Sequence, residues 1–213
     1  MAITYPLDTP TDIGIAQIEL RANKAATISR SPFTYKTQVH SYPGQIWGAN
    51  ISIPPVRRVF AEPWVSFLLS LRGRLGTFLL GDPLGANPRG TISGDTVLVN
   101  NAGITGANQA GDRSIFVDGL TPGTTGLLLP GDYIQLGSSS GATLHKVLTS
   151  VDSDASGEAE IDIWPAIRRD LNDNESVTYT DAKGLFRLAA NLREWEINDI
   201  INYGISFECI EVI

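Results

Sequence analysis

Hydrophobic and polar residues alternate over much of the chain, which is typical of half-buried β-strands. The first such run contains Ile13, Ile15, Ile18 and Leu20. Its alternation slips once, and a β-bulge would explain the slip. Near the other end, residues 203–210 alternate again and place Phe207 on the apolar side of a strand. These patterns predict a mainly β fold in which both ends of the chain contribute strands to one β-sandwich.

Prolines and glycines divide the next region into expected strands. Pro43-Gly44 separates two strand-like runs, residues 38–42 and 45–53, and therefore predicts a hairpin turn. Pro54-Pro55 is expected to end the second run because proline cannot donate to the sheet ladder. Residues 77–80 read as another short apolar strand.

One segment has helical periodicity instead. An apolar stripe at positions i, i+3, i+4 and i+7 is formed by Trp64, Phe67, Leu68 and Leu71. Pro63 suits the first turn of a helix, and Gly73 can adopt the left-handed conformation that ends one. We expect the stripe, together with Phe207, to belong to the hydrophobic core.

Charge divides the chain into two parts. Residues 88–181 contain 13 acidic and 5 basic residues, a balance of −8, whereas the remainder has 10 acidic and 11 basic residues, a balance of +1. Turn-forming residues flank the acidic segment, and inside it short apolar runs alternate with Gly-rich or Asp-rich turns. The sequence therefore predicts a discontinuous β-sandwich body, residues 1–87 plus 182–213, and an inserted, barrel-like β domain at residues 88–181.

The overall charge argues against a nucleic-acid-binding protein. The net charge of −7 would repel phosphates, although the wall of a channel through which DNA passes can be acidic. Cys209 is the only cysteine, so no disulfide within the chain is possible. The first ten residues lack the features of a signal peptide, and no apolar run approaches the ~18 residues of a spanning helix. We expect synthesis in the cytosol and no membrane anchor.

Motifs with catalytic or metal-binding potential all lie in unfavourable contexts. The sequence Gly137-Ser138-Ser139-Ser140-Gly141 matches a hydrolase nucleophile elbow, but a strand-like run follows it instead of a helix. Residues 152–157 resemble the start of an EF-hand loop, but Ile163 occupies the position of the bidentate glutamate. Both segments are better interpreted as polar hairpin turns. His40 and His145 belong to no metal-ligand pattern, so we expect no catalytic residue, metal or cofactor.

Several segments outside the insert resemble the distal tail proteins of siphophages, which are minor tail proteins of long-tailed bacteriophages. The most specific are Glu62-Pro63-Trp64, Phe67-Leu68, Leu71-Arg72-Gly73 and Gly76-Thr77-Phe78-Leu79-Leu80-Gly81-Asp82-Pro83. Others are Ser31-Pro32-Phe33, the run from Tyr42 to Trp47, Ile53-Pro54-Pro55, Arg57-Arg58 and the closing Tyr203-Gly204-Ile205-Ser206-Phe207. The resemblance covers roughly half of the chain.

The resemblance implies a structural virion protein at the tail tip. Such proteins form a ring, usually a hexamer, with a β-sandwich body, and they join the last ring of the tail tube protein to the hub and tip proteins. DNA passes through the lumen only in transit. Two alternatives remain open: another tail component, such as the tube or hub protein, and a carbohydrate-binding host-recognition module that uses Trp47, Trp164 or Trp195.

Electrostatics predicts which surfaces would meet in a ring. Inserts carrying 13 carboxylates each would repel one another, so contacts are expected through the near-neutral body. Basic candidates near the expected helix and hairpin are Arg57, Arg58, Arg72 and Arg74. Their acidic partners would be Glu194, Glu196 or Asp199 of a neighbour or of the same chain. Charge reversal at Arg57 and Arg58 is accordingly expected to impair assembly more than deletion of residues 90–179.

Overall fold

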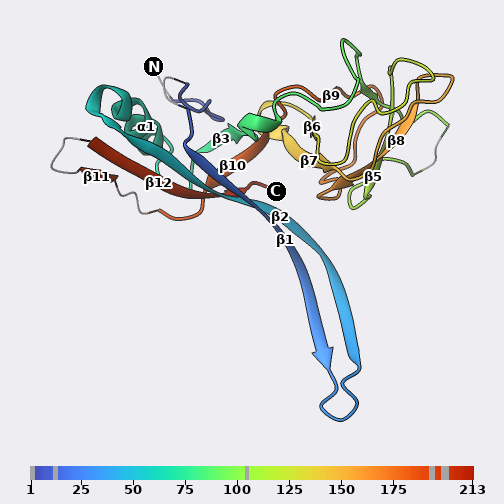
Figure 1. Ribbon diagram of the computed structural model, residues 1–213, viewed down its shortest axis with the longest axis horizontal. Coiled ribbons are helices and arrows are strands. Elements are labelled where there is room, and N and C mark those ends of the chain that lie inside the picture. Colours follow the sequence, from blue (N-terminus) through green and yellow to red (C-terminus); the bar gives the residue numbers. More distant parts are fainter. Residues whose placement is uncertain (1–2, 12–13, 104–105, 192–194, 198–201) are drawn as a thin grey trace.

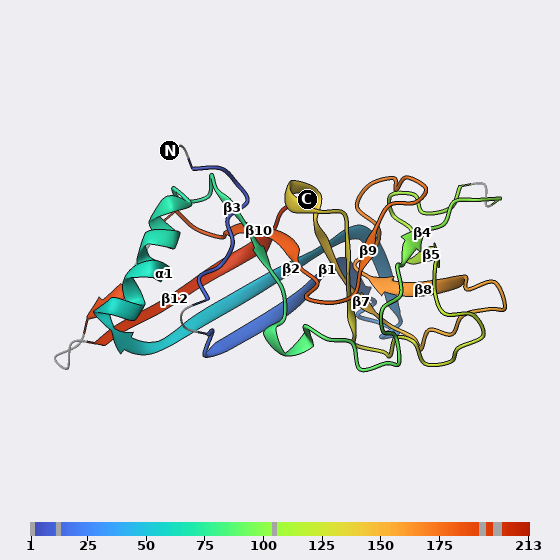
Figure 2. The same ribbon diagram turned by 90° about the horizontal axis from the view of Figure 1, so that it is seen from above.

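The computed structural model describes residues 3–11, 14–103, 106–191, 195–197 and 202–213. It is mainly β, with two sheets, one of them nearly barrel-like, and one α-helix in the described part of the chain. The mainly β fold class with a single helix, which the sequence predicts, is confirmed. Figures 1 and 2 show the two sheets side by side along the long axis of the molecule.

The first sheet combines strands from both ends of the chain. In the described residues it contains β1 (Gln17–Arg30), β2 (Thr37–Arg57), β3 (Thr77–Leu80), β10 (Gly184–Leu188), β11 (Trp195–Ile197) and β12 (Asn202–Glu211). The order is β1-β2-β12-β10-β3, with β11 also paired to β12, and all pairs are antiparallel. The closing strand thus lies in the same sheet as the first strand. The domain boundaries at residues 87/88 and 181/182 stay a prediction.

Helix α1 (Arg58–Ser70) covers one face of this sheet (Figure 2). The residues that the sequence places in the core are buried there: Trp64, Phe67, Leu68, Leu71 and Phe207. Trp64 packs against Phe207 with ring centroids 6.2 Å apart, and Phe67 packs edge-on against Phe78 at 5.5 Å. Burying each such side chain contributes roughly 1.5–3 kcal/mol, so this cluster anchors the helix to the sheet.

The helix begins earlier than the sequence predicts. Pro63 lies inside α1 and not in its first turn. The extra turn is supported by an ion pair, in which Arg58 Nε lies 2.8 Å from Glu62 Oε1 one helical turn later. At the other end, the expected left-handed conformation of Gly73 is confirmed by its φ of +70°.

The expected hairpin at Pro43-Gly44 and the expected strand end at Pro54-Pro55 are both wrong. β2 runs through both sites, and its true hairpin with β1 turns at residues 31–36. The register shifts opposite each proline site: Lys24 faces Gln45 but Ala26 faces Ser41, and Ile53 faces Ile205 but Val56 faces Tyr203. The prolines therefore lie in bulges, where a missing ladder hydrogen bond costs little.

The second sheet is formed by the central part of the chain. Its strands in the described residues are β4 (Leu98–Val99), β5 (Ser114–Asp118), β6 (Tyr133–Leu136), β7 (Thr143–Val147), β8 (Ala159–Trp164) and β9 (Val177–Thr178). They follow the order β4-β5-β8-β7-β6-β9, and a bridge between Leu98 and Ser176 brings the two edges together. The interior holds a separate apolar cluster that includes Ile115, Leu136 and Ile161. We call this unit the barrel.

Polar contacts fix the barrel against the first sheet. The indole Nε1 of Trp47 donates to the carbonyl of Leu144 at 2.9 Å, and Leu144 packs in the core of the first sheet. Close by, the buried carboxylate of Glu211 accepts from Arg168 Nη2 at 2.6 Å and from the backbone N–H of Trp47 at 3.0 Å. The orientation of the barrel is therefore set by directional bonds as well as by apolar packing.

Candidate assembly surface

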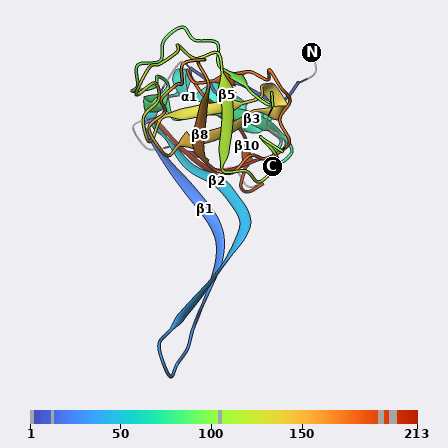
Figure 3. The ribbon, with the colours of Figure 1, turned by 90° about the vertical axis from the view of Figure 1, so that its right-hand side faces the viewer.

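A β-ribbon projects from the molecule without support from its core. β1 and β2 continue as a two-stranded hairpin well beyond the other strands of the sheet (Figures 1 and 3). We call residues 22–44 the arm, and every one of them is exposed except the half-buried Ser31. An isolated two-stranded hairpin is marginally stable in water. The arm is thus an element that the core of its own chain does not stabilise.

The arm has one apolar face. Ile28 and Val39 are directly paired across the two strands and are 68% and 62% exposed. Paired residues point to the same side of a ribbon, so the two form one apolar contact surface. The opposite face carries polar pairs, including Thr27 with His40.

The tip of the arm combines exposed aromatic rings with positive charge. Phe33 is 92% exposed and Tyr35 is 67% exposed. The guanidinium carbon of Arg30 lies 4.6 Å from the centroid of the Tyr35 ring, within the range of a cation–π contact. Exposed aromatic residues with an adjacent arginine are typical of residues that anchor protein–protein interfaces.

The four arginines expected at the interface form two separate pairs. Arg57 and Arg58 lie at the start of α1, whereas Arg72 and Arg74 follow its end. A helix of 13 residues separates the pairs by about 20 Å. All four are exposed, but the fold does not bring them together into one patch.

Their expected acidic partners are only partly defined. Arg58 pairs with Glu62 of its own helix, and no ion pair joins Arg57, Arg72 or Arg74 to another described residue. Glu196 is exposed on β11, and Glu194 and Asp199 lie outside the described residues. The use of these residues between copies stays a prediction.

Exposed apolar side chains accompany both arginine pairs. Val59 and Phe60, at the start of α1, are 78% and 48% exposed, and Leu69 and Leu75, near its end, are 55% and 69% exposed. Single exposed apolar residues are common on protein surfaces, so neither group alone defines an interface.

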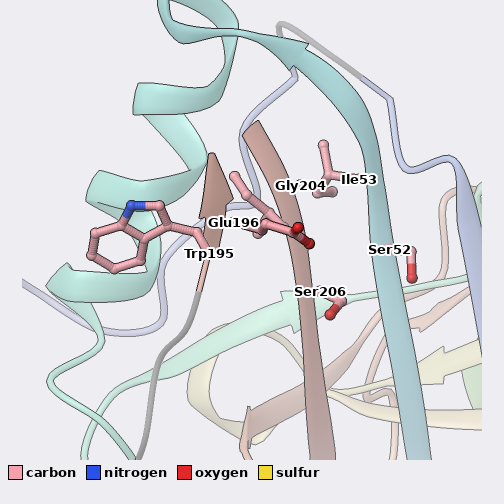
Figure 4. A pocket seen from close by; sticks show the side chains of 7 residues that line it. Ser52, Ile53, Trp195, Glu196, Gly204 and Ser206 are labelled. Carbon is pink, nitrogen blue, oxygen red and sulfur yellow. The ribbon is translucent and has the colours of Figure 1, made fainter. Parts of the chain in front are cut away.

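A groove of about 640 Å³ lies beside β11 and is lined by Ser52, Ile53, Trp195, Glu196, Gly204, Ile205 and Ser206. Figure 4 shows the Trp195 ring directed toward the α1 side, while Glu196 points away from it. Neighbouring residues of a strand point to opposite sides, so the ring and the carboxylate do not converge on one ligand. This geometry does not favour a sugar platform at Trp195.

The other two candidate tryptophans lie at the junction of the two sheets. Trp47 is 4% exposed and meets Trp164 edge-on, with ring centroids 4.5 Å apart. Both rings therefore stabilise the junction and are not available as an exposed binding surface.

The polar motifs are hairpin and turn structures. Residues 137–141 connect β6 and β7, which are paired antiparallel. In the loop before β8, Asp154 Oδ1 accepts from the N–H groups of Ser156 and Glu158, at 2.8 and 2.9 Å.

Among the described residues, no group of three or more His, Cys, Asp or Glu side chains is arranged to hold a metal ion. No helix in the described residues is long and apolar enough to cross a membrane.

Neither a protein-family model nor a curated protein sequence matches the chain.

The arm is the feature that the pattern of strands and turns does not reveal. Its signal in the sequence is electrostatic: residues 20–61 contain six Lys and Arg residues and no Asp or Glu, in a chain of net charge −7. Three of the six, Lys24, Arg30 and Lys36, lie in the arm, so the arm is cationic in an otherwise acidic protein.

Proposed function

We propose that this chain is a structural, ring-forming subunit of the tail tip of a long-tailed bacteriophage. It would stand at the distal end of the tail tube and join the tube protein to hub and tip proteins. Its place of action would be the virion, after synthesis and assembly in the host cytoplasm. The proposal assigns it no catalytic step and no cofactor.

The single observation that carries the proposal is the arm. A ribbon with an apolar pair in the middle and two aromatic rings at the tip exposes surface that a monomer would normally bury. Identical copies that bind head to tail form a ring if the repeated rotation from one copy to the next returns to the first copy. An arm that reaches from each copy to the next would supply such a contact.

Two further features agree with this role. The residues that resemble siphophage distal tail proteins include those of the α1 core and the closing strand, which build the body that would carry the arm. The net charge of −7 suits a conduit, since an acidic wall would repel passing DNA and keep it from binding.

Removal of the arm tests the proposal. Lys24 and Gln45 are paired across β1 and β2, so a two-residue Asn-Gly turn can replace residues 25–44 and keep the buried Gln45, which accepts from the N–H of Ala166. Negative-stain microscopy and light scattering over a range of concentrations should give closed rings for the full chain. The arm-deleted chain should fold with a similar melting temperature and stay monomeric.

A milder variant serves as a control on the deletion. Ile28→Thr with Val39→Thr keeps good strand formers but removes the apolar face, and it should weaken ring formation without abolishing the fold. Open stacks of the full chain would favour a tube protein. Rings formed equally well without the arm, or a full chain that is monomeric at every concentration, would overturn the proposal.

A further inference from the structure

The arm carries positive charge that its own chain does not neutralise. Lys24, Arg30 and Lys36 are its cationic residues, and it contains no Asp or Glu. None of the three makes an ion pair with another described residue. Arg30 and Lys36 flank the turn that holds Phe33 and Tyr35, so the tip is both cationic and aromatic.

The barrel carries a groove of opposite charge. The groove has a volume of about 410 Å³ and is lined by Asn100, Phe116, Val117, Asp152, Asp154, Glu158, Ala159 and Glu160. Its four carboxylates are all exposed, and its lining contains no Lys or Arg. We call it the acidic groove.

The contacts of these carboxylates are made by neutral donors. Asp152 accepts from the N–H of Gly126 at 2.7 Å, and Glu158 accepts from the side-chain amide of Asn100 at 3.1 Å. Backbone N–H groups of Glu158 and Ser156 hold the pKa of Asp154 below its ordinary value. The groove is therefore anionic at neutral pH and lacks a cation from any described residue of its own chain.

The arm of one chain does not meet its own groove. Figures 1 and 3 show the arm extending below the body, so that its tip lies well clear of β5 and β8, which contribute residues to the groove. From Ala22 to Arg30 a strand extends about 26 Å, which carries the tip well away from the body of its own chain. Charge complementarity between arm and groove can therefore be satisfied only between two copies.

We propose that the tip of the arm docks into the acidic groove of the adjacent copy. The inference rests on the proposed ring and names the surfaces that meet in it. Arg30 and Lys36 would pair with the groove carboxylates, and Phe33 or Tyr35 would pack against the Phe116 side. This contact would give the acidic insert, which forms the barrel, a role in assembly that the sequence analysis did not assign to it. Two inserts still repel each other, but an insert and an arm attract. Deletion of residues 90–179 should then abolish assembly.

Cross-linking between single-cysteine chains tests the contact directly. The native Cys209 is fully buried, and burial raises the pKa of its thiol to about 12, so it stays unreactive. Chains with Thr34→Cys at the tip are mixed with chains carrying Ala155→Cys in the loop beside the groove, both exposed positions. A short bismaleimide should join the two chains, while Ser140→Cys, in the β6–β7 hairpin, serves as the matched control and should give little product.

Charge exchange tests the cause of the contact. Arg30→Glu with Lys36→Glu should lower the apparent affinity between copies by at least about tenfold. Glu158→Lys with Glu160→Lys in the groove should do the same, and mixing the two reversed proteins should restore cross-linking between them. Arg30→Lys with Lys36→Arg keeps the charge and should retain most of the cross-linking.

Each outcome separates this inference from the proposed function. Rings without the tip-to-groove product, or reversed charges without rescue, would overturn the inference and leave the ring in place. Failure to find either oligomers or product would overturn both. Binding of a DNA duplex by the arm without the product would make nucleic acid the partner and would also overturn the inference.

Discussion

A single buried histidine makes the stability of this protein sensitive to acid. His145 is fully buried, its Nδ1 lies 2.7 Å from the carbonyl of Pro165, and its Nε2 lies 2.9 Å from the hydroxyl of Thr143. The neutral ring satisfies both contacts by donating to Pro165 and accepting from Thr143. Burial, with a smaller contribution from Arg168, lowers the pKa of His145 from 6.5 to about 4.

The sign of the pH effect follows from the lowered pKa. Between about pH 6.5 and 4 the unfolded chain binds a proton at His145 and the folded chain does not, so the free energy of unfolding falls as the pH falls. The loss should reach about 3 kcal/mol below pH 4. His145→Gln can keep both hydrogen bonds but cannot titrate. Urea titrations at several pH values should therefore show a flatter profile for the variant, and equal slopes would contradict this role of His145.

The ion pair at the junction of the sheets should matter more than an exposed pair on the same strand. Glu211 and Arg168 have side chains that are 1% and 11% exposed, whereas Glu208 and Arg21 are 51% and 38% exposed. Glu211→Ala leaves a buried guanidinium and the N–H of Trp47 without their acceptor, which should cost about 3–5 kcal/mol. Glu208→Ala should cost less than about 1 kcal/mol. Denaturant titration of both variants decides the comparison, and similar losses would show that the junction does not depend on Glu211.

At the level of the element, α1 offers a matched pair of leucines. Leu68 is 2% exposed in the core, whereas the next residue, Leu69, is 55% exposed at the surface. Leu68→Ala removes buried surface and leaves a cavity, so the free energy of unfolding should fall by about 2–5 kcal/mol. Leu69→Ala should change stability by less than about 0.5 kcal/mol, but it could still weaken assembly. A neutral result for Leu68→Ala in denaturant would mean that the stripe does not form the core.

The same helix shows what sequence patterns can predict and where they fail. The stripe from Trp64 to Leu71 is predictable because burial imposes a period of 3.6 residues on it. The start of the helix is not, because α1 continues upstream of Pro63, where Ala61 is buried in the core and Arg58 pairs with Glu62. Local propensity is a weak guide wherever a neighbouring contact compensates for it.

The arm was not predictable as a strand pair because its sequence lacks an alternating pattern. Alternation arises when one face of a strand is buried against a core, and neither face of the arm is buried within one chain. Pro43-Gly44 therefore looked like the turn, although the register places it in a bulge of β2. The candidate assembly surface is recognisable in the sequence only by the absence of carboxylates from residues 20–61.

For the whole molecule, the proposed contact would resolve a conflict between charge and assembly. Identical chains with a balance of −8 on residues 88–181 would repel one another in any arrangement that brings these segments together. Placing uncompensated cations on a separate ribbon allows each copy to present both signs at different positions. The attraction would then join two different surfaces, the arm of one copy and the groove of the next. A ring of identical subunits is built from such head-to-tail contacts.

Proteolysis provides a test of this arrangement in the intact chain. Lys24, Arg30 and Lys36 are exposed trypsin sites on a ribbon that has no core of its own, so the free monomer should be cut first within the arm. An arm held in a neighbour's groove should be protected, and cleavage there should become slower as protein concentration rises. Because exposed charges are screened within about 10 Å at 0.1 M salt and about 3 Å at 1 M, high salt should restore rapid cleavage. Mass spectrometry of the first fragments locates the cut, and a cleavage rate in the arm that is the same for free and assembled protein would show that the arm is not the contact between copies.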